Sequence, residues 1–334
     1  MTALAWHRAE LERIAASRAS LPHALLLHGP RGIGKLAFAQ ALARSLLCEA
    51  PAAGGTACGA CSACLWFAAG THPDYRVIEP AGAGTDEEGE QVGRASTVIA
   101  VDQIRALFDF VNMSSHRGRA KAVVLHPAEA LNVNAANALL KALEEPPPRT
   151  HFLLVSHRPH LLLPTIKSRC RKVPLHAPDP KGASAWLASQ GVRNADLALA
   201  HVGDAPLLAL ELQETDYWGA RAAFLRQLTA TELDVLKAAE ALRDVPVPYV
   251  IAWLQKWSYD IAHYQAAGRV RYNPDHVDAI ARAATESDRL AVLRFHREMV
   301  QLQRDAQHPL NARLFIEQVL LAYRDALGAA RVPA

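Results

Sequence analysis

The chain has 334 residues, of which 51% are hydrophobic and 21% charged, and its formal net charge is +3. This length allows two or three domains, and no run approaches the roughly 20 apolar residues of a membrane helix, so the sequence predicts no membrane segment. A charge this small does not by itself indicate a nucleic-acid-binding face, and the amino-terminal residues lack a secretory signal pattern, so we expect a cytoplasmic protein.

The first part of the chain, residues 1–176, alternates short apolar runs with helical patterns, which is typical of a parallel sheet flanked by helices. Strands are predicted at residues 24–28, 75–78, 122–126, 152–156 and 172–175. Helices are predicted at residues 35–47, 101–112 and 134–145, and three prolines follow the last of them. Residues 81–97 carry turn and charged residues without apolar periodicity and are expected to form a mobile loop.

A phosphate-binding loop is predicted directly after the first strand, where the sequence reads GPRGIGK and a helix follows. Its candidate nucleotide-binding residues are Gly29, Gly32, Gly34 and Lys35. The glycines let backbone N–H groups surround phosphates, and the lysine can reach the terminal phosphates. The next position should be Ser or Thr, whose hydroxyl ligates magnesium, but it is Leu36. Magnesium therefore loses a ligand.

The acidic pair that would hold magnesium and position water is also missing. It is expected at the end of the strand at residues 122–126, where the sequence has His126 and Pro127. Glu129 follows two residues later and is the one alternative carboxylate. The loop is therefore either a structural remnant or a holder of nucleotide without hydrolysis, and the sequence favours a chain without ATPase activity.

Four cysteines, Cys48, Cys58, Cys61 and Cys64, are separated by nine, two and two residues. Thiolates are soft ligands for tetrahedral zinc, so the spacing predicts one closed structural Zn²⁺ site. The alternative is a pair of disulfides, which a reducing cytoplasm disfavours. Cys170 lies far from this cluster and is interpreted as a buried small apolar residue.

Strand-like runs end near residue 178, and the remaining chain has helical patterns. Residues 183–212 are expected to form a small helical unit and residues 216–327 a larger bundle. Trp253, Trp257 and Ile261 are spaced four apart and are interpreted as core residues of that bundle.

Three further stretches resemble a known family. They are residues 137–147 (NALLKALEEPP), residues 163–170 (LPTIKSRC) and residues 308–323 (HPLNARLFIEQVLLAY). Together with the cysteine cluster they are similar to the bacterial clamp loader subunits of the AAA+ superfamily, both the gamma/tau ATPase and the delta-prime subunit of DNA polymerase III. The degraded nucleotide site and the lack of arginine in residues 203–210 favour the delta-prime family. The alternatives are an active gamma/tau-like clamp loader ATPase and a stand-alone zinc protein that binds nucleic acid.

The resemblance implies an α/β fold: a RecA-like AAA+ P-loop domain at residues 1–176 with a zinc-binding module at residues 48–64. A small helical lid domain at residues 177–215 and an all-α collar domain at residues 216–334, which serves oligomerisation, would follow. It implies a stator in a hetero-pentamer with gamma/tau ATPase subunits and the delta subunit. That complex would load the sliding clamp on primed-template DNA during replication, and any nucleotide on this chain would not be hydrolysed.

The resemblance also assigns a catalytic role in trans to Arg169, as an arginine finger at the ATP site of the adjacent subunit. A guanidinium is permanently charged and stabilises charge on a transferred phosphoryl group. The alternative is a surface ion pair. Nearby basic residues are candidates for phosphate contact or for a solvated face: Lys167, Arg171, Lys172, Arg117, Arg119 and Lys121.

Overall fold

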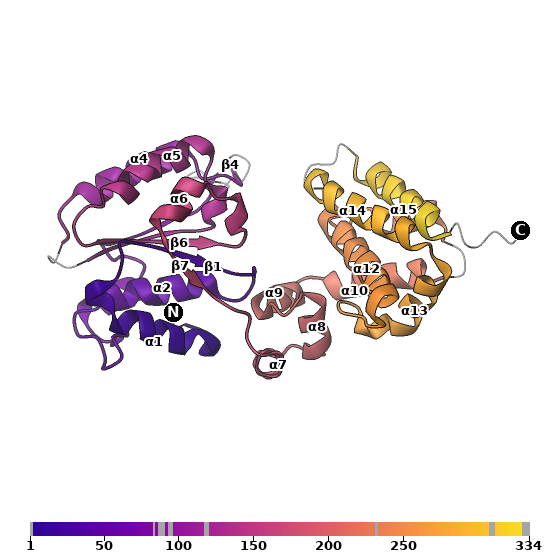
Figure 1. Cartoon of the computed structure of the whole chain (residues 1–334), viewed down its shortest axis with the longest axis horizontal. Helices are drawn as coiled ribbons and strands as arrows, with labels where there is room; N and C mark the ends of the chain where they lie inside the picture. Colours follow the sequence, from indigo (N-terminus) through magenta and orange to yellow (C-terminus); the bar gives the residue numbers. More distant parts are fainter. Residues whose placement is uncertain are drawn as a thin grey trace, which may run out of the picture. The chain divides into compact units, whose positions relative to one another are not determined.

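The computed structural model describes residues 3–82, 84–85, 91–92, 96–116, 120–230, 233–306 and 311–328. Backbone contacts divide the chain into two compact units, Met1–Pro178 and Asp179–Ala334 (Figure 1). The division between these units, after Pro178, lies close to the predicted boundary at residue 176. Among the described helices, none combines the length and apolar character that a membrane span requires.

A five-stranded parallel sheet forms the centre of the first unit. Its strands are β1 (Ala24–His28), β2 (Tyr75–Ile78), β5 (Lys121–Leu125), β6 (Thr150–Ser156) and β7 (Arg171–Pro174). Their order is β2-β5-β6-β1-β7, and every neighbouring pair is parallel. The bounds of β1 and β2 are those predicted, and the other strands differ by one or two residues at their ends. The expected RecA-like α/β fold is confirmed.

Helices cover both faces of this sheet (Figure 1). Side chains alternate between the faces along a strand, so Leu25 and Leu27 enter one core while Ala24 and Leu26 enter the other. One face carries α1 (Arg8–Ala16), α2 (Lys35–Leu47) and α3 (Ser62–Ala68). The other carries α4 (Val101–Asn112), α5 (Val133–Glu144) and α6 (Pro164–Arg169). Burial on both faces explains why the central strands β1, β5 and β6 carry continuous apolar runs.

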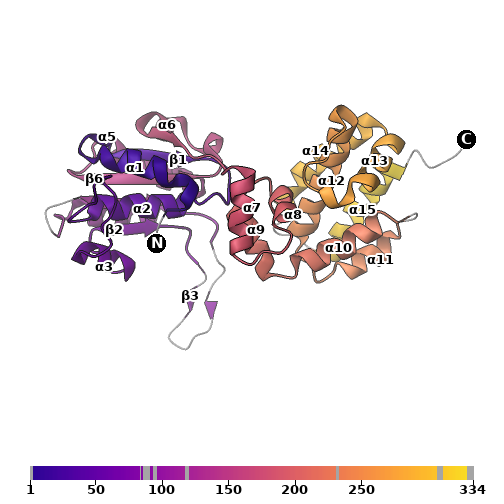
Figure 2. The same cartoon turned by 90° about the horizontal axis from the view of Figure 1, so that it is seen from below.

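A short antiparallel ladder lies apart from the main sheet (Figure 2). It pairs β3 (Gly84–Thr85) with β4 (Gln91–Val92). This pairing falls within the segment that was predicted to be an irregular loop, and it was not anticipated. Most other residues of that segment lie outside the described residues.

The second unit is entirely helical in its described part and contains two hydrophobic cores. The smaller core joins α7 (Pro180–Ser189), α8 (Ala195–His201) and α9 (Pro206–Glu211). The larger core joins α10 (Tyr217–Leu228), α11 (Val235–Ala241), α12 (Val247–Ala267), α13 (Val277–Glu286), α14 (Arg289–Asp305) and α15 (Ala312–Gly328). Trp253, Trp257 and Ile261 are buried in it, as predicted. The two cores support a boundary near residue 215, although a three-domain division stays a prediction.

Single turns of 3-10 helix connect several of these elements. They are η1 (Ala5–His7), η2 (Arg18–Ser20), η3 (Ala128–Ala130), η4 (Pro159–Leu161), η5 (Leu212–Glu214) and η6 (Pro274–His276). Among them, η1 contacts the phosphate loop, and η3 contacts the turn that follows β6.

A buried carboxylate on α12 holds the chain segment that follows this helix. Asp260 is completely buried and accepts backbone hydrogen bonds from Arg271 at 2.8 Å, Tyr272 at 3.1 Å and Asn273 at 2.8 Å. It also accepts a bond from the Asn273 side chain at 2.7 Å. These bonds satisfy the buried donors of Asn273 and the partly buried N–H groups of the two residues before it.

A buried guanidinium on α10 supports the same segment. Arg221 makes a two-pronged ion pair with Asp275 at 2.7 and 2.9 Å and donates to Asn273 at 2.7 Å. The carbonyl of Tyr272 accepts a hydrogen bond from Nδ1 of His201, at the end of α8, at 3.1 Å. The segment therefore connects the three short helices to the larger bundle, which explains why they form one compact unit.

Asp260→Ala is expected to lower the free energy of unfolding by about 3–5 kcal/mol, because it leaves the buried donors of Asn273 and two partly buried N–H groups without an acceptor. Urea unfolding monitored by circular dichroism would measure the change. The matched control is Asp278→Ala, which removes an exposed aspartate from α13 of the same bundle and should change stability by less than about 0.5 kcal/mol. Equal effects of the two substitutions would contradict the role of Asp260.

Candidate functional site

The phosphate loop connects the carboxyl end of β1 to the first residue of α2, Lys35. A Cβ atom at Gly29 would lie 2.1 Å from the carbonyl oxygen of Leu175, so no side chain fits there. Gly34 caps α2 with a φ of 92°, which other residues rarely adopt. Gly32 lies between them, also at positive φ. The loop thus has the backbone form that its sequence predicts.

Lys35 is directed into the loop itself. The residue is 2% exposed, and its ammonium donates hydrogen bonds to the carbonyl of Gly29 at 2.8 Å and to the carbonyl of Pro30. Burial lowers the pKa of Lys35 to about 8, and the nearby Glu129 carboxylate opposes this shift. A phosphate group would have to replace these bonds in order to bind the lysine.

The amino-terminal turn η1 also bonds to the loop. Nε1 of Trp6 donates to the carbonyl of Ile33 at 3.0 Å, and Nε2 of His7 donates to the same oxygen at 2.9 Å. Burial lowers the pKa of His7, which favours the neutral ring. These contacts were missed from the sequence, because no local pattern indicates which distant residues will meet the loop.

The position after the lysine belongs to the hydrophobic core. Leu36 is partly buried and packs against the apolar cluster beneath α2. At the end of β5, Nδ1 of His126 lies 2.8 Å from Oε1 of Glu79. Neither Leu36, His126 nor Pro127 offers a carboxylate or hydroxyl oxygen of the kind that magnesium prefers.

Glu129 lies in η3, and its carboxylate accepts hydrogen bonds from backbone N–H groups. Its Oε1 accepts hydrogen bonds from the N–H groups of His157 at 2.9 Å and Arg158 at 3.0 Å. Burial raises the pKa of Glu129, but hydrogen bonds from groups that include Ser156 and His157 outweigh burial and leave this pKa below its usual value. Oε1 therefore holds the turn after β6, and the use of Glu129 as a substitute for the missing acidic pair stays a prediction.

The four cysteines of the predicted metal module come together between α2 and α3. Their Sγ atoms all lie within 4.8 Å of one another, and those of Cys48 and Cys61 are 3.9 Å apart. Four thiolates around one zinc ion at about 2.3 Å are separated by about 3.8 Å. The backbone N–H of Cys58 donates to Sγ of Cys48 at 3.3 Å, which orients this sulfur. The cluster has the dimensions of a tetrahedral thiolate site.

The four thiols differ in acidity. For Cys61, burial raises the pKa, but hydrogen bonds from backbone N–H groups and neighbouring thiols have the larger, opposite effect and lower the pKa to about 6. Backbone hydrogen bonds also lower the pKa of Cys58, whereas burial raises that of Cys48 to about 12 and raises that of Cys64. A divalent cation would supply the positive charge needed to keep all four sulfurs deprotonated.

Arg169 is the last residue of α6, and its side chain is 33% exposed. Nη2 lies 2.5 Å from Oε1 of Glu144, and Nη1 donates to the carbonyl of Thr165 at 3.0 Å. The adjacent Cys170 is buried in the core, as predicted, and burial raises its pKa to about 12. A surface ion pair was the alternative interpretation of Arg169, although its partner Glu144 was not predicted, and the role of Arg169 toward another subunit stays a prediction.

The basic neighbours differ in their surroundings. Lys121 is buried, and its ammonium donates to the carbonyls of Phe110 and Met113 at the end of α4. Its interpretation as a solvated residue is therefore wrong, whereas a phosphate contact stays a prediction. Arg171 and Lys172 are exposed and Lys167 is partly exposed, whereas residues 117 and 119 lie outside the described part of the chain.

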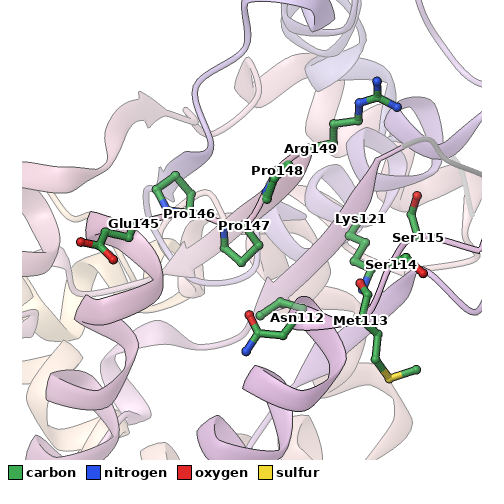
Figure 3. A pocket seen from close by; sticks show the side chains of 11 residues that line it. Asn112, Met113, Ser114, Ser115, Lys121, Glu145, Pro146, Pro147, Pro148 and Arg149 are labelled. Atoms are coloured by element: carbon green, nitrogen blue, oxygen red, sulfur yellow. The ribbon is translucent and has the colours of Figure 1, made fainter.

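Lys121 also lines a groove of about 670 Å³ (Figure 3). Residues 111–115 form one side of it and residues 145–149 the other. Lys121 is the first residue of β5, whereas the phosphate loop follows the last residue of β1, and these strands run parallel within one sheet. The groove therefore lies at the amino-terminal ends of the strands, whereas the nucleotide loop lies at their carboxyl ends.

Comparison with known proteins finds two matching family profiles. One, described as DNA polymerase III, delta subunit, matches residues 8–179. The other, described as DNA polymerase III, delta subunit, C terminal, matches residues 215–325. The chain is 42% identical to DNA polymerase III subunit delta' of Pseudomonas aeruginosa, over 78% of this chain and 77% of that protein. It is 35% identical to that of Escherichia coli (75% and 73%) and 32% identical to that of Yersinia pestis (92% and 90%).

Proposed function

The chain belongs to the delta' family of DNA polymerase III subunits, and we propose on this premise that it is the non-hydrolysing stator of a clamp loader. Its partners would be gamma/tau ATPase subunits and a delta subunit in a hetero-pentamer in the cytoplasm. Through that complex it would act on the sliding clamp and on primed-template DNA during replication.

The main support for this proposal is the chemistry of the phosphate loop and its surroundings. The loop keeps its glycines and Lys35, but Leu36 packs into the core where a magnesium ligand is needed. The acidic pair is replaced by His126 and Pro127. A nucleotide that bound here would lack both the metal and the group that positions water for hydrolysis.

A chain without hydrolysis can still contribute to hydrolysis by a neighbour. Arg169 is partly exposed at the end of a helix, and its guanidinium carries a permanent charge. We propose that it reaches the ATP of an adjacent gamma/tau subunit and stabilises the transition state in trans.

The thiol cluster would hold one structural Zn²⁺. Cys48, Cys58, Cys61 and Cys64 supply four sulfur ligands, so the site would be closed and would leave no position for a reacting water. Zinc would fix the segment between α2 and α3. The phosphate loop lies before the first residue of α2, and the cysteines follow its last residue. The ion would therefore stabilise the domain at the other end of this helix, without taking part in ATP chemistry.

The isolated chain is expected to release no phosphate from ATP, because it lacks the metal ligands. Phosphate release would be measured for the chain alone and after mixing it with candidate clamp loader subunits, with primed DNA present. Light scattering of the mixture should give the mass of a hetero-oligomer, and only the mixture should hydrolyse ATP.

An active gamma/tau-like ATPase is the competing function. It predicts turnover of about 1 s⁻¹ or faster by the chain alone, in the range of ordinary enzymes. The control is Lys35→Ala, which would abolish intrinsic turnover but not that of a contaminant. Turnover that depends on Lys35 would contradict the proposal.

A further inference from the structure

Two groups from different helices hold the guanidinium of Arg169. Nη2 faces Oε1 of Glu144, the last residue of α5, at 2.5 Å, while Nη1 donates to the carbonyl of Thr165 one turn earlier on α6 at 3.0 Å. A guanidinium is planar, so two bonds to different nitrogens determine the direction of that plane. Without Glu144, only the bonds within α6, to the carbonyl of Thr165 and at 3.5 Å to Oγ of Ser168, and the rotamer preferences of a long side chain would remain.

The backbone beneath this ion pair is fixed by the core. Ile166 is 1% exposed and Cys170 is 7% exposed, and both lie in the same hydrophobic cluster as Leu139 and Leu143 of α5. The ends of α5 and α6 are therefore held at a constant separation whether or not the ion pair forms. What the ion pair determines is the orientation of the Arg169 side chain.

Glu144 occupies an unfavourable position for a carboxylate. It ends α5, where the unpaired carbonyl groups of the helix carry partial negative charge, and Glu145 follows it directly. Arg169 ends α6, where a cation is favoured. The carboxylate thus lies where helix electrostatics oppose it, and Arg169 is the described cation that pairs with it.

The bonds to Glu144 and Thr165 leave donors on Arg169 for another group. A guanidinium has five N–H donors, and this side chain is 33% exposed. We propose that Glu144 is a positioning residue, which orients the Arg169 guanidinium toward the phosphoryl group in the ATP site of the adjacent subunit. This inference rests on the function proposed for Arg169.

The opposite role for Glu144 would be to withhold Arg169 from the nucleotide. The exposure of the pair disfavours this role, because ion pairs in contact with solvent are weak. A terminal phosphate carries more charge than one carboxylate and would compete well for the guanidinium. Orientation needs only a weak, directional contact, whereas withholding needs a strong one.

Glu144→Gln in the reconstituted complex is expected to lower the rate of DNA-stimulated ATP hydrolysis at the adjacent site by about two- to fivefold, the range of one exposed ion pair. It should not lower kcat below that of Arg169→Ala. KM for ATP should be unchanged, because the contact acts in the transition state. Glu144→Asp, which keeps the charge but shortens the reach, should give an intermediate kcat. The matched control, Glu145→Gln, should retain the full kcat, since Glu145 forms no ion pair with another described residue.

The double variant separates positioning from a structural role. In the Arg169→Ala background, Glu144→Gln should cause no further loss, because the residue acts only through Arg169. An additive loss, an impaired assembly of both Glu144 variants or an increase in kcat would each overturn the inference. An unchanged kcat in Glu144→Gln, beside a large loss in Arg169→Ala, would overturn it while leaving the proposed function intact. If Arg169→Ala itself has no effect, the proposed function fails and this inference fails with it.

Discussion

Arg169→Ala is expected to remove hydrolysis at the ATP site of the adjacent subunit while the complex still assembles. An arginine supplied in trans contributes about 10³ to 10⁵ in rate to phosphoryl transfer. The DNA- and clamp-stimulated ATPase of the whole complex should therefore fall to the rate of its remaining sites. Clamp loading should fall with it.

The fold should tolerate this substitution. Ile166 and Cys170, which anchor the end of α6 in the core, are unchanged, and the lost pair with Glu144 is exposed. Such pairs contribute about 0–1 kcal/mol to stability. Arg169→Lys should restore little activity, because an ammonium cannot present the planar pair of donors that contacts two phosphate oxygens.

The measurement is ATPase activity together with the mass of the complex by size exclusion and light scattering. Arg171→Ala is the matched control, because it removes an exposed arginine two residues further along the chain. An intact Arg169→Ala complex with unchanged ATPase and clamp loading would show that Arg169 forms only a surface ion pair. Equal losses in both variants would indicate a general effect of surface charge.

Cys61→Ser is expected to eliminate bound zinc and to lower the melting temperature of the chain by about 10 °C. Each kcal/mol shifts the melting temperature of a domain of this size by about 2–4 °C, and zinc binding is coupled to folding of the surrounding loop. Cys61 directly precedes α3, which carries Cys64 and the core residue Phe67. Loss of the ion would therefore release this helix from the domain core.

Elemental analysis should find about one zinc per wild-type chain and none in the variant. A chelator should lower the melting temperature of the wild-type protein to that of Cys61→Ser and leave the variant unchanged. Cys170→Ala is the control, since it alters a buried cysteine outside the cluster and should retain zinc. A wild-type protein of full stability without metal, or a disulfide between Cys58 and Cys61 in protein from a reducing cytoplasm, would contradict the zinc site.

The sequence by itself determined the main elements of the first unit. Residues 24–28 and 35–47 form the strand and helix that flank the phosphate loop, within the predicted bounds. Their patterns are local, since a buried parallel strand needs a continuous apolar run and a phosphate loop needs glycines at fixed offsets. The spacing of the four cysteines is equally local, and it was sufficient to predict their meeting.

The tertiary structure alone decided which partners the polar side chains have. Lys121 caps the end of α4, Glu129 holds the turn after β6, and Glu144 pairs with Arg169. Asp260 likewise binds a segment that follows its own helix. The side chain of each residue offers several possible hydrogen bonds, and packing of segments far apart in the sequence selects among them. For this reason the sequence indicated Arg169 as a candidate, whereas only the fold revealed the carboxylate that pairs with it.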